Sequence, residues 1–337
     1  MEKSSFSIIG CQHAHIQVFI EEMLHLGHRC AGIFDDQKES NLAAILSHKY
    51  DIPLLSNMED ALKPEIEIVG CAAINQRKID VIELCEQRNK HIMLDKPMVT
   101  DRHGLSRLEA VMERGNIQIG MLLTERFHPA IYTLKQQIDE GALGELVSIA
   151  MRKPHRLSVN NRPEWFFHRE QSGGIINDLL IHDIDLLRWF TESEIITAEG
   201  YMRKQILNEY PTFYDSAQLL VQMESGLVAQ LYADWHTPGK SWTWGDCRIF
   251  VAGTKGSAEL RLLGDPLVSQ TPMMLKVTGE YSLHSVMLLN PPCGIMQDFL
   301  HCIEGKHAIL TGKDVLNASK AAVEADENVK TVPLLFK

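Results

Sequence analysis

Residues 173–190 hold the side chains in this chain that are best suited to chemistry. The segment reads as a helix that is apolar on nearly every side, which indicates a buried helix. Asp178, His182 and Asp185 interrupt it at positions i, i+4 and i+7, so the three side chains share one face. Burying two carboxylates and an imidazole is costly unless they are paired or line a cleft. The stripe is therefore either an acid/base site or a set of satisfied core residues.

Short apolar runs alternate with helix-like segments before this helix. The runs that read as strands are residues 6–10, 30–34, 66–71, 91–94 and 117–123, and the segments that read as helices are residues 15–26, 38–49, 78–89 and 101–114. This alternation predicts a parallel sheet that is covered on both faces. Such sheets bind ligands at the carboxyl ends of their strands. The residues that fall there are Gly10, Asp35, Ala73, Asn75 and Lys96.

The turn after the first predicted strand lies where a dinucleotide-binding turn belongs, because a glycine is followed by a helix whose N-terminus can hold a pyrophosphate. Only Gly10 of the usual glycine pattern is present, and Gln12 stands where a central glycine lets phosphate approach the backbone. Asp35 follows the second strand, where an acid accepts the ribose hydroxyls of NAD and repels a 2′-phosphate. The alternative for Asp35 is a cap on the next helix.

His13 and His15 raise the question of a metal ion. No second cluster with metal-like spacing follows them, so we predict no metal site and expect these histidines to contact a cofactor or to fill the first helical turn. The seven cysteines are scattered and form no Cys-x-x-Cys pair. Their number and spacing argue against a zinc site or a disulfide framework and favour a reducing cytoplasm.

The tripeptide Asp95-Lys96-Pro97 follows the fourth predicted strand. A lysine at the carboxyl end of a strand, held by a following proline, is a fixed cation at the ligand-binding edge of the sheet. An ordinary surface turn is the alternative, since Asp and Pro are common in turns. The functional interpretation is favoured by the layout before the tripeptide, in which a turn at Asn75 is followed by a predicted helix and then by the fourth strand.

An ordered set of motifs runs through nearly the whole chain. It comprises Gly10, Asp35, Asn75, Asp95-Lys96-Pro97, residues 126–129, residues 141–145, Gly173-Gly174, the Asp178–His182–Asp185 stripe and residues 253–256. Together these residues resemble the glucose-fructose oxidoreductase / inositol dehydrogenase / rhizopine catabolism (Gfo/Idh/MocA) family of sugar and polyol oxidoreductases. Residues 181–185 are most similar to its inositol dehydrogenase branch. Three positions depart from the family pattern, namely Gln12 for the central glycine, Asp95 for Glu and Lys78 for a frequent His.

The resemblance implies an α/β fold in two domains. Residues 1–122 would form a Rossmann domain with a doubly wound parallel sheet, and residues 123–337 a substrate-binding and oligomerisation domain with a large open, mainly antiparallel sheet. The second half agrees when read alone, because its strand-like runs between residues 146 and 278 mostly follow one another without long helices.

The chemistry expected of these residues is oxidation of a secondary alcohol. His182 would accept the hydroxyl proton, and Lys96 would favour the developing alkoxide. Asp178 would bind a neighbouring hydroxyl and help to set the charge of the imidazole. Asp185 would either orient the ring from behind, without being catalytic, or form a structural salt bridge. The resemblance implies the same roles for Lys96, Asp178 and His182.

The expected cofactor is NAD rather than NADP. The residues expected to contact it are Gly10, Gln12, His13, Ala14, Asp35, Ala73, Asn75, Asp95, Lys96 and Pro97. The residues expected to contact a sugar or polyol substrate are Lys96, Arg126, His155, Trp165, Asp178 and His182. Aromatic faces beside polar donors suit a sugar ring, although packing is the default explanation for the residues outside the stripe.

Two other functions stay open. An enzyme that retains NAD could cleave or epimerise a glycoside through a transient keto sugar, using the same residues. A non-catalytic regulator could sense NAD or a sugar on the same fold, but a sensor needs no base, and the presence of Lys96, Asp178 and His182 together argues against it.

Composition and charge narrow the classes of molecule that the chain can bind. With 45% hydrophobic and 23% charged residues among 337, the chain has the composition of a globular protein with room for two domains. A net charge of −11 without a basic cluster argues against nucleic acid, and no apolar run is long enough to span a membrane. The N-terminus does not read as a signal peptide. An open sheet predicts a homodimer or homotetramer through that face.

Overall fold

The computed structural model describes residues 4–36 and 40–332. Contacts group the chain into two compact units. The first consists of Met1–Leu123, Arg162–Gly174 and Cys293–Lys320, and the second of Thr124–Asn161, Ile175–Pro292 and Ala321–Lys337. Two late segments therefore pack with the N-terminal residues rather than with their neighbours in the sequence.

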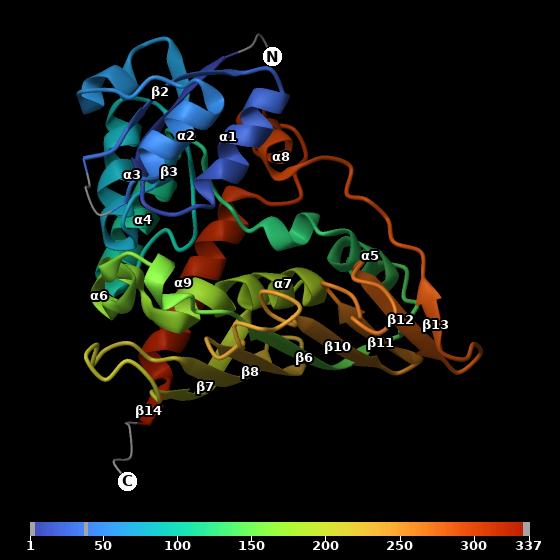
Figure 1. Cartoon of the computed structure of the whole chain (residues 1–337). Helices are drawn as coiled ribbons and strands as arrows, with labels where there is room; N and C mark the ends of the chain where they lie inside the picture. Colours follow the sequence, from blue (N-terminus) through green and yellow to red (C-terminus); the bar gives the residue numbers. More distant parts are fainter. Residues whose placement is uncertain (1–3, 37–39, 333–337) are drawn as a thin grey trace. The chain divides into compact units, whose positions relative to one another are not determined.

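A five-stranded parallel sheet forms the centre of the first unit (Figure 1). In spatial order its strands are β2 (Arg29–Phe34), β1 (Ser5–Cys11), β3 (Ile66–Ala72), β4 (His91–Leu94) and β5 (Ile119–Met121). The α-helices of the unit are α1 (Ile16–His25), α2 (Leu42–Tyr50), α3 (Lys78–Gln87), α4 (Arg102–Arg114), α6 (Arg169–Ser172), α8 (Ile295–Ile303) and the start of α9 (Gly312–Asn328), and its 3-10 turns are η1 (Met58–Leu62), η2 (Asn75–Arg77) and η5 (Glu164–Phe167). The strand order reverses between β1 and β3, which is the point where doubly wound sheets bind ligands.

The core of this unit follows from strands that are apolar on both faces. β1 is buried from Phe6 to Cys11, and the Phe6 ring meets Phe19 of α1 edge-on with 5.3 Å between ring centroids. The α4 helix has clear local signals at both ends, since the Asp101 side chain accepts a hydrogen bond from the amide of Gly104 and the helix ends on the left-handed Gly115. Residues 38 and 39 of the predicted helix 38–49 lie outside the described residues.

A nine-stranded mixed sheet forms the centre of the second unit (Figure 1). In spatial order its strands are β13 (His284–Val286), β12 (Met273–Thr278), β11 (Gly256–Arg261), β10 (Arg248–Gly253), β6 (Leu146–Pro154), β9 (Val228–Asp234), β8 (Ser216–Met223), β7 (Ile195–Arg203) and β14 (Lys330–Val332). The pairs β6–β9 and β7–β14 are parallel, and the other pairs are antiparallel. The other elements are η3 (Thr124–Phe127), α5 (Pro129–Asp139), η4 (Val159–Asn161), the π-helical turn η6 (Ile176–Leu180), α7 (Ile181–Thr191) and the end of α9.

The two faces of this sheet differ in character. Burial alternates along β8, where Leu219 and Val221 are buried and Gln218 and Leu220 are exposed, as expected for a strand covered on one side only. The η6 turn and α7 pack on the covered side against β9 and β6. The predicted α/β class, with a parallel Rossmann sheet and an open, mainly antiparallel sheet, is confirmed.

The structure adds one detail to the predicted helix 173–190. Gly173 ends the short helix α6 in a left-handed conformation, and the chain then forms the π turn η6 before α7 begins at Ile181. Among the described residues, no helix is long and apolar enough to cross a membrane.

Candidate active site

The turn that ends β1 lies at the reversal of strand order in the first unit. Gly10 has a φ of +79°, and a Cβ at this position would lie 2.5 Å from the Cβ of Ala73 at the end of β3. Only glycine fits this conformation and this approach. A hollow beside the turn is lined by Ile9, Gly10, Met58, Ala73 and Val81, among others. The close approach at Gly10 and the hollow beside it lie at the switch point, where doubly wound sheets bind nucleotides.

Gln12 takes up a position that links it to the predicted ribose-binding acid. It is buried, and its Nε2 donates a hydrogen bond to Oδ2 of Asp35 at 2.7 Å. The side chain that replaces the central glycine is thereby held on the carboxylate that follows β2. A bound ribose has to share that carboxylate with the Gln12 amide or displace the amide from it.

Asn75 opens the η2 turn after β3, at the same edge of the sheet. Its Nδ2 donates to the carbonyl oxygen of Ser172 at 2.8 Å. Its Oδ1 is buried and has no hydrogen-bond partner among the described residues. An acceptor left in this state is costly, so the position fits a bound group that brings a donor.

The Asp95-Lys96-Pro97 turn follows β4 and contains a cis peptide bond between Lys96 and Pro97. Lys96 itself is buried, with 5% of its surface exposed. The fully buried Lys78 supports the turn, since its Nζ donates to the carbonyl oxygens of Asp95 at 2.7 Å and Pro97 at 3.1 Å. The departure from the family pattern at position 78 therefore places a second cation beneath the turn.

Two histidines meet the carboxylate of this turn. Nδ1 of His13 lies 3.0 Å from Oδ2 of Asp95, and Nδ1 of His15 lies 2.9 Å from Oδ1. Burial lowers the pKa of His13 to about 4 in spite of the attraction of Asp95. Burial alone would raise the pKa of Asp95, but His13, Lys78 and His15 together hold it well below its usual range. Near neutral pH, His13 is therefore neutral and Asp95 is ionised.

The polar stripe belongs to the second unit, where Asp178 lies in the π turn η6 and His182 in the first turn of α7. Both side chains are buried, with 5% and 9% of their surfaces exposed. The amide of Ile181 donates to the carbonyl oxygen of Ile176, five residues back, which widens this turn by one residue. π turns inside helices are frequent at functional sites, so this backbone feature supports a functional role for the stripe.

Asp185 has a structural partner. Its carboxylate forms a two-armed ion pair with Arg126 of η3, in which Nε donates at 2.9 Å and Nη2 at 2.6 Å. The Arg126 guanidinium also lies 5.2 Å from the ring of Trp189. With 1% of its surface exposed, Arg126 has almost no area to offer a ligand. The ion pair thus favours the structural interpretation of Asp185, and the substrate contact expected of Arg126 stays a prediction.

A buried ionic network flanks His182 in the same unit. Nζ of Lys153 on β6 lies 2.5 Å from Oε1 of Glu125 and 3.1 Å from Oδ1 of Asp183. Oε2 of Glu125 and Oδ2 of Asp183 are buried and have no hydrogen-bond partner among the described residues. Two carboxylates therefore share one ammonium group.

The two carboxylates of this network titrate differently. Burial raises the pKa of Asp183 to about 7, because the attraction of Lys153 offsets only part of the desolvation and Glu125 repels a second charge. Burial also acts on Glu125, but the charges of Lys153 and His182 outweigh it and lower the pKa of Glu125 to about 2. The pKa of Lys153 is raised in spite of its burial, because Asp183 and Glu125 both attract its charge.

The remaining predicted substrate residues lie in different units. His155 follows β6 in the second unit, and its ring meets Trp235 edge-on with 5.8 Å between centroids. Trp165 belongs to the η5 turn of the first unit, where it is buried, and its Nε1 has no hydrogen-bond partner among the described residues. Ala14 and His15 are exposed at the start of α1. Lys96 lies in the first unit, whereas Asp178 and His182 lie in the second.

Sequence reasoning missed the supporting charges. Lys153 stands two residues after Met151 and four after Ile149, so it lies on the apolar face of its strand. Lys78 precedes Ile79 on the buried side of α3 in a similar way. A lysine on an apolar face is a recognisable signal of an internal ion pair, and it identifies both residues.

These features define a class of protein. A parallel sheet with a dinucleotide cradle, joined to a second unit that presents a buried acid and imidazole on one helix, is the architecture of a nucleotide-dependent oxidoreductase. Residues 5–121 match the model of the oxidoreductase family with an NAD-binding Rossmann fold, and residues 131–259 match the model of the GFO/IDH/MocA C-terminal domain. The chain belongs to the GFO/IDH/MocA oxidoreductase family.

Inositol and sugar dehydrogenases are among the proteins that are similar to this chain. Inositol 2-dehydrogenase 2 of Saccharopolyspora erythraea is 25% identical over 170 residues, which cover 50% of this chain and 47% of that protein, so the match spans about half the length of this relative. The scyllo-inositol 2-dehydrogenase (NAD(+)) of Bacillus subtilis is 28% identical over 289 residues, 81% of this chain and 79% of the relative. The structure of UDP-N-acetylglucosamine 3-dehydrogenase from Acidithiobacillus ferrooxidans shares the fold at a TM-score of 0.77 and 19% identity, over 98% of this chain and 99% of that one.

Proposed function

We propose that the protein is an NAD-dependent dehydrogenase that oxidises a secondary alcohol of a cyclic polyol, a sugar or a sugar derivative. The observation that carries the proposal is the burial of the three groups the reaction needs. Lys96, Asp178 and His182 expose 5%, 5% and 9% of their surfaces. Keeping charged and titratable groups out of water is costly, and a reaction that uses them gives a reason to keep them.

Each of these residues has a defined task in the proposed reaction. The His182 imidazole accepts the proton of the substrate hydroxyl, and the Lys96 ammonium hydrogen-bonds the same oxygen and stabilises its developing negative charge. Asp178 accepts a hydrogen bond from a neighbouring substrate hydroxyl. When bound, the nicotinamide supplies the acceptor for the hydride that leaves the carbinol carbon.

The cofactor-binding residues support NAD over NADP. The carboxylate of Asp35 follows β2, where it accepts ribose hydroxyls and repels a 2′-phosphate, and Gln12 donates its amide to that carboxylate. We expect NAD⁺ to bind at least about tenfold more tightly than NADP⁺, and an Asp35→Ser variant to lose most of that difference. Quenching of tryptophan fluorescence during titration with each nucleotide measures both affinities. Equal affinities in the unaltered protein would remove the argument from Asp35.

The activity itself is tested with a panel of inositols, aldoses and their glycosides in the presence of NAD⁺ or NADP⁺. Accumulation of reduced nucleotide with at least one compound supports the dehydrogenase. Conversion of a glycoside without net reduced nucleotide supports the enzyme that retains its cofactor. Bound NAD without conversion of any compound argues for the sensing regulator.

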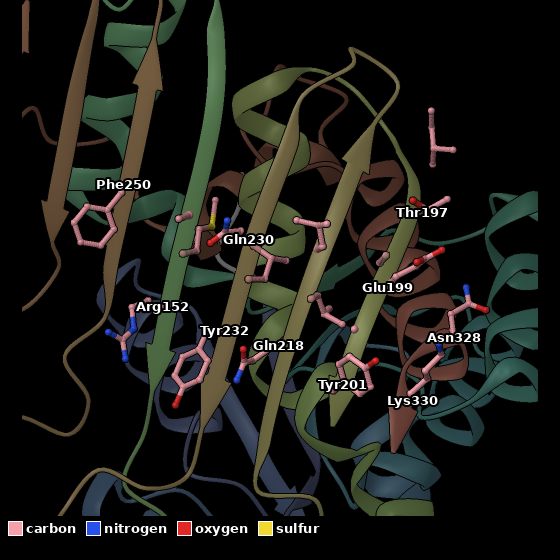
Figure 2. A pocket seen from close by; sticks show the side chains of 18 residues that line it. Arg152, Thr197, Glu199, Tyr201, Gln218, Gln230, Tyr232, Phe250, Asn328 and Lys330 are labelled. Atoms are coloured by element: carbon pink, nitrogen blue, oxygen red, sulfur yellow. The ribbon is translucent and has the colours of Figure 1, made fainter. Parts of the chain in front are cut away.

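We also propose that the open face of the nine-stranded sheet is the contact surface of a homo-oligomer. Figure 2 shows the shallow hollow on this face, whose floor is formed by side chains from neighbouring strands. Large apolar side chains are exposed there, among them Ile196, Tyr201, Leu220 and Phe250 at 56%, 55%, 53% and 39%. A solvent-exposed apolar surface of this kind is typical of an interface between subunits.

Substitution at the centre of this face tests the oligomer. Leu220→Glu places a charge in the hollow and should shift the mass measured by light scattering toward the monomer. Leu267→Glu is the matched control, because Leu267 is 94% exposed in a loop outside the hollow. A monomeric unaltered protein, or equal behaviour of the two variants, would contradict the proposal.

We also propose that the protein works in the cytoplasm. Its seven cysteines are free thiols, which fits a reducing compartment.

A further inference from the structure

The cluster of His13, His15 and Asp95 lies within the first unit and joins two of its turns. His13 follows β1, His15 is the N-cap of α1, and Asp95 follows β4. The two histidines come from one turn and the carboxylate from another, eighty residues later in the chain. Because Asp95 is so distant in the sequence, the spacing of residues near the two histidines does not reveal this third donor.

The donor set and its spacing are those of a metal site. One donor atom from each of the three side chains lies within 4.8 Å of the other two. The carboxylate of Asp95 presents one oxygen to each imidazole, with Oδ2 at 3.0 Å from Nδ1 of His13 and Oδ1 at 2.9 Å from Nδ1 of His15.

We infer that His13, His15 and Asp95 bind one divalent transition-metal ion of the zinc class, which clamps the turn before α1 to the turn that carries Lys96. Two imidazoles and one carboxylate are a donor set that Zn²⁺ accepts with one position left for water.

The surrounding charges limit the affinity. Nζ of Lys78 lies 3.8 Å from Oδ2 of Asp95, so the carboxylate already faces one cation, and the Lys96 charge acts on His13 as well. Nζ of Lys78 also donates hydrogen bonds to the carbonyl oxygens of Asp95 and Pro97, and these dipoles reduce the repulsion between the Lys78 charge and a bound cation. We therefore expect a reversible site with a dissociation constant on the order of micromolar rather than the far tighter binding of a structural zinc site.

Titration of the full-length protein with Zn²⁺ and Co²⁺ near neutral pH tests the inference. The unaltered protein should take up one Zn²⁺ per chain with micromolar affinity and should melt at a higher temperature when loaded. Bound Co²⁺ should show the visible absorption of nitrogen and oxygen ligands without the intense near-ultraviolet band of a thiolate, which excludes binding by one of the seven cysteines.

Variants at the two histidines complete the test. His15→Gln, at a half-exposed side chain, and His13→Gln should each weaken uptake by about 100-fold. His103→Gln on α4 is a matched control at an exposed position, and His301→Gln removes a member of the separate Cys293–Asp298–His301 group. Both controls should keep the uptake of the unaltered protein. Absence of Zn²⁺ uptake, or uptake that survives in both His13→Gln and His15→Gln, would overturn the inference, and neither result depends on dehydrogenase activity.

Discussion

The Asp183→Asn variant is expected to remove a pH dependence of stability that the native network creates. Asp183 shares the ammonium of Lys153 with Glu125, and burial raises its pKa from 3.8 to about 7. The folded protein therefore holds this proton through the range where the unfolded chain has already released it. Stability falls as pH rises from the unfolded to the folded pKa, because in that window the folded state binds more protons.

The size of the effect follows from the displacement of the pKa. Each unit corresponds to about 1.4 kcal/mol, so between about pH 5 and pH 8 the ionisation of Asp183 should lower the free energy of unfolding by about 2 to 3 kcal/mol. Glu125, with a pKa of about 2, and Lys153, with a raised pKa, keep their charges throughout this range. Asn accepts the Lys153 hydrogen bond without a charge, so the variant does not lose this free energy of unfolding. Relative to the native protein, its free energy of unfolding should rise by about 2 to 3 kcal/mol over the same change of pH.

Urea unfolding at both pH values, followed by tryptophan fluorescence, measures how much the free energy of unfolding changes with pH in the native protein and in the variant. Titration of the other groups occurs in both proteins and largely cancels. If native and variant proteins change by the same amount between the two pH values, the assignment of a neutral Asp183 beside Lys153 is wrong.

Two further predictions concern the cradle and the ion pair. Gly10→Ala should lower the free energy of unfolding by about 2 to 4 kcal/mol and weaken NAD⁺ binding, since the added Cβ meets Ala73 at 2.5 Å. Gly115→Ala is its control, because φ is +65° there but nothing lies within 4 Å, and it should cost only about 1 kcal/mol in the same melt. Arg126→Met should destabilise by about 3 to 5 kcal/mol by leaving Asp185 unpaired in the interior, and adding Asp185→Leu should restore most of the loss. A double variant as unstable as Arg126→Met alone would show that the pair does not act as a unit.

Patterns along the chain were sufficient to predict the fold class. The parallel sheet follows from apolar strands alternating with helices, and the mainly antiparallel sheet from strand-like runs that follow one another without long helices. The open face of that sheet came from the family resemblance, because Leu219, Leu220 and Val221 of β8 are all apolar and only their burial alternates. Local signals also placed Gly10 and the Asp95-Lys96-Pro97 turn at the carboxyl edge. What the pattern could not show is that Arg162–Gly174 and Cys293–Lys320 pack with the first unit, because these contacts join segments far apart in the sequence.

The candidate site was predictable in its residue types but not in its pairings. The stripe suggested that Asp185 could be structural, yet only the fold reveals Arg126 as its partner, 59 residues away. The same holds for Lys153 with Asp183 and for His15 with Asp95, where each partner comes from a different element. The π turn at Ile176–Leu180 also has no sequence signal, since the same residues suit an unbroken α-helix.

The central claim is that His182 is the base and Lys96 the stabilising cation of a dehydrogenase. The most direct measurement is the rate of reduced-nucleotide formation from NAD⁺ with the best compound of the inositol and sugar panel, for native, His182→Asn and Lys96→Met proteins under conditions where NAD⁺ binding is verified. We predict turnover by the native protein and a loss of at least about 100-fold in kcat for each variant, with NAD⁺ still bound. Native-like turnover by either variant, or no turnover by the native protein with any compound despite bound NAD⁺, would contradict it.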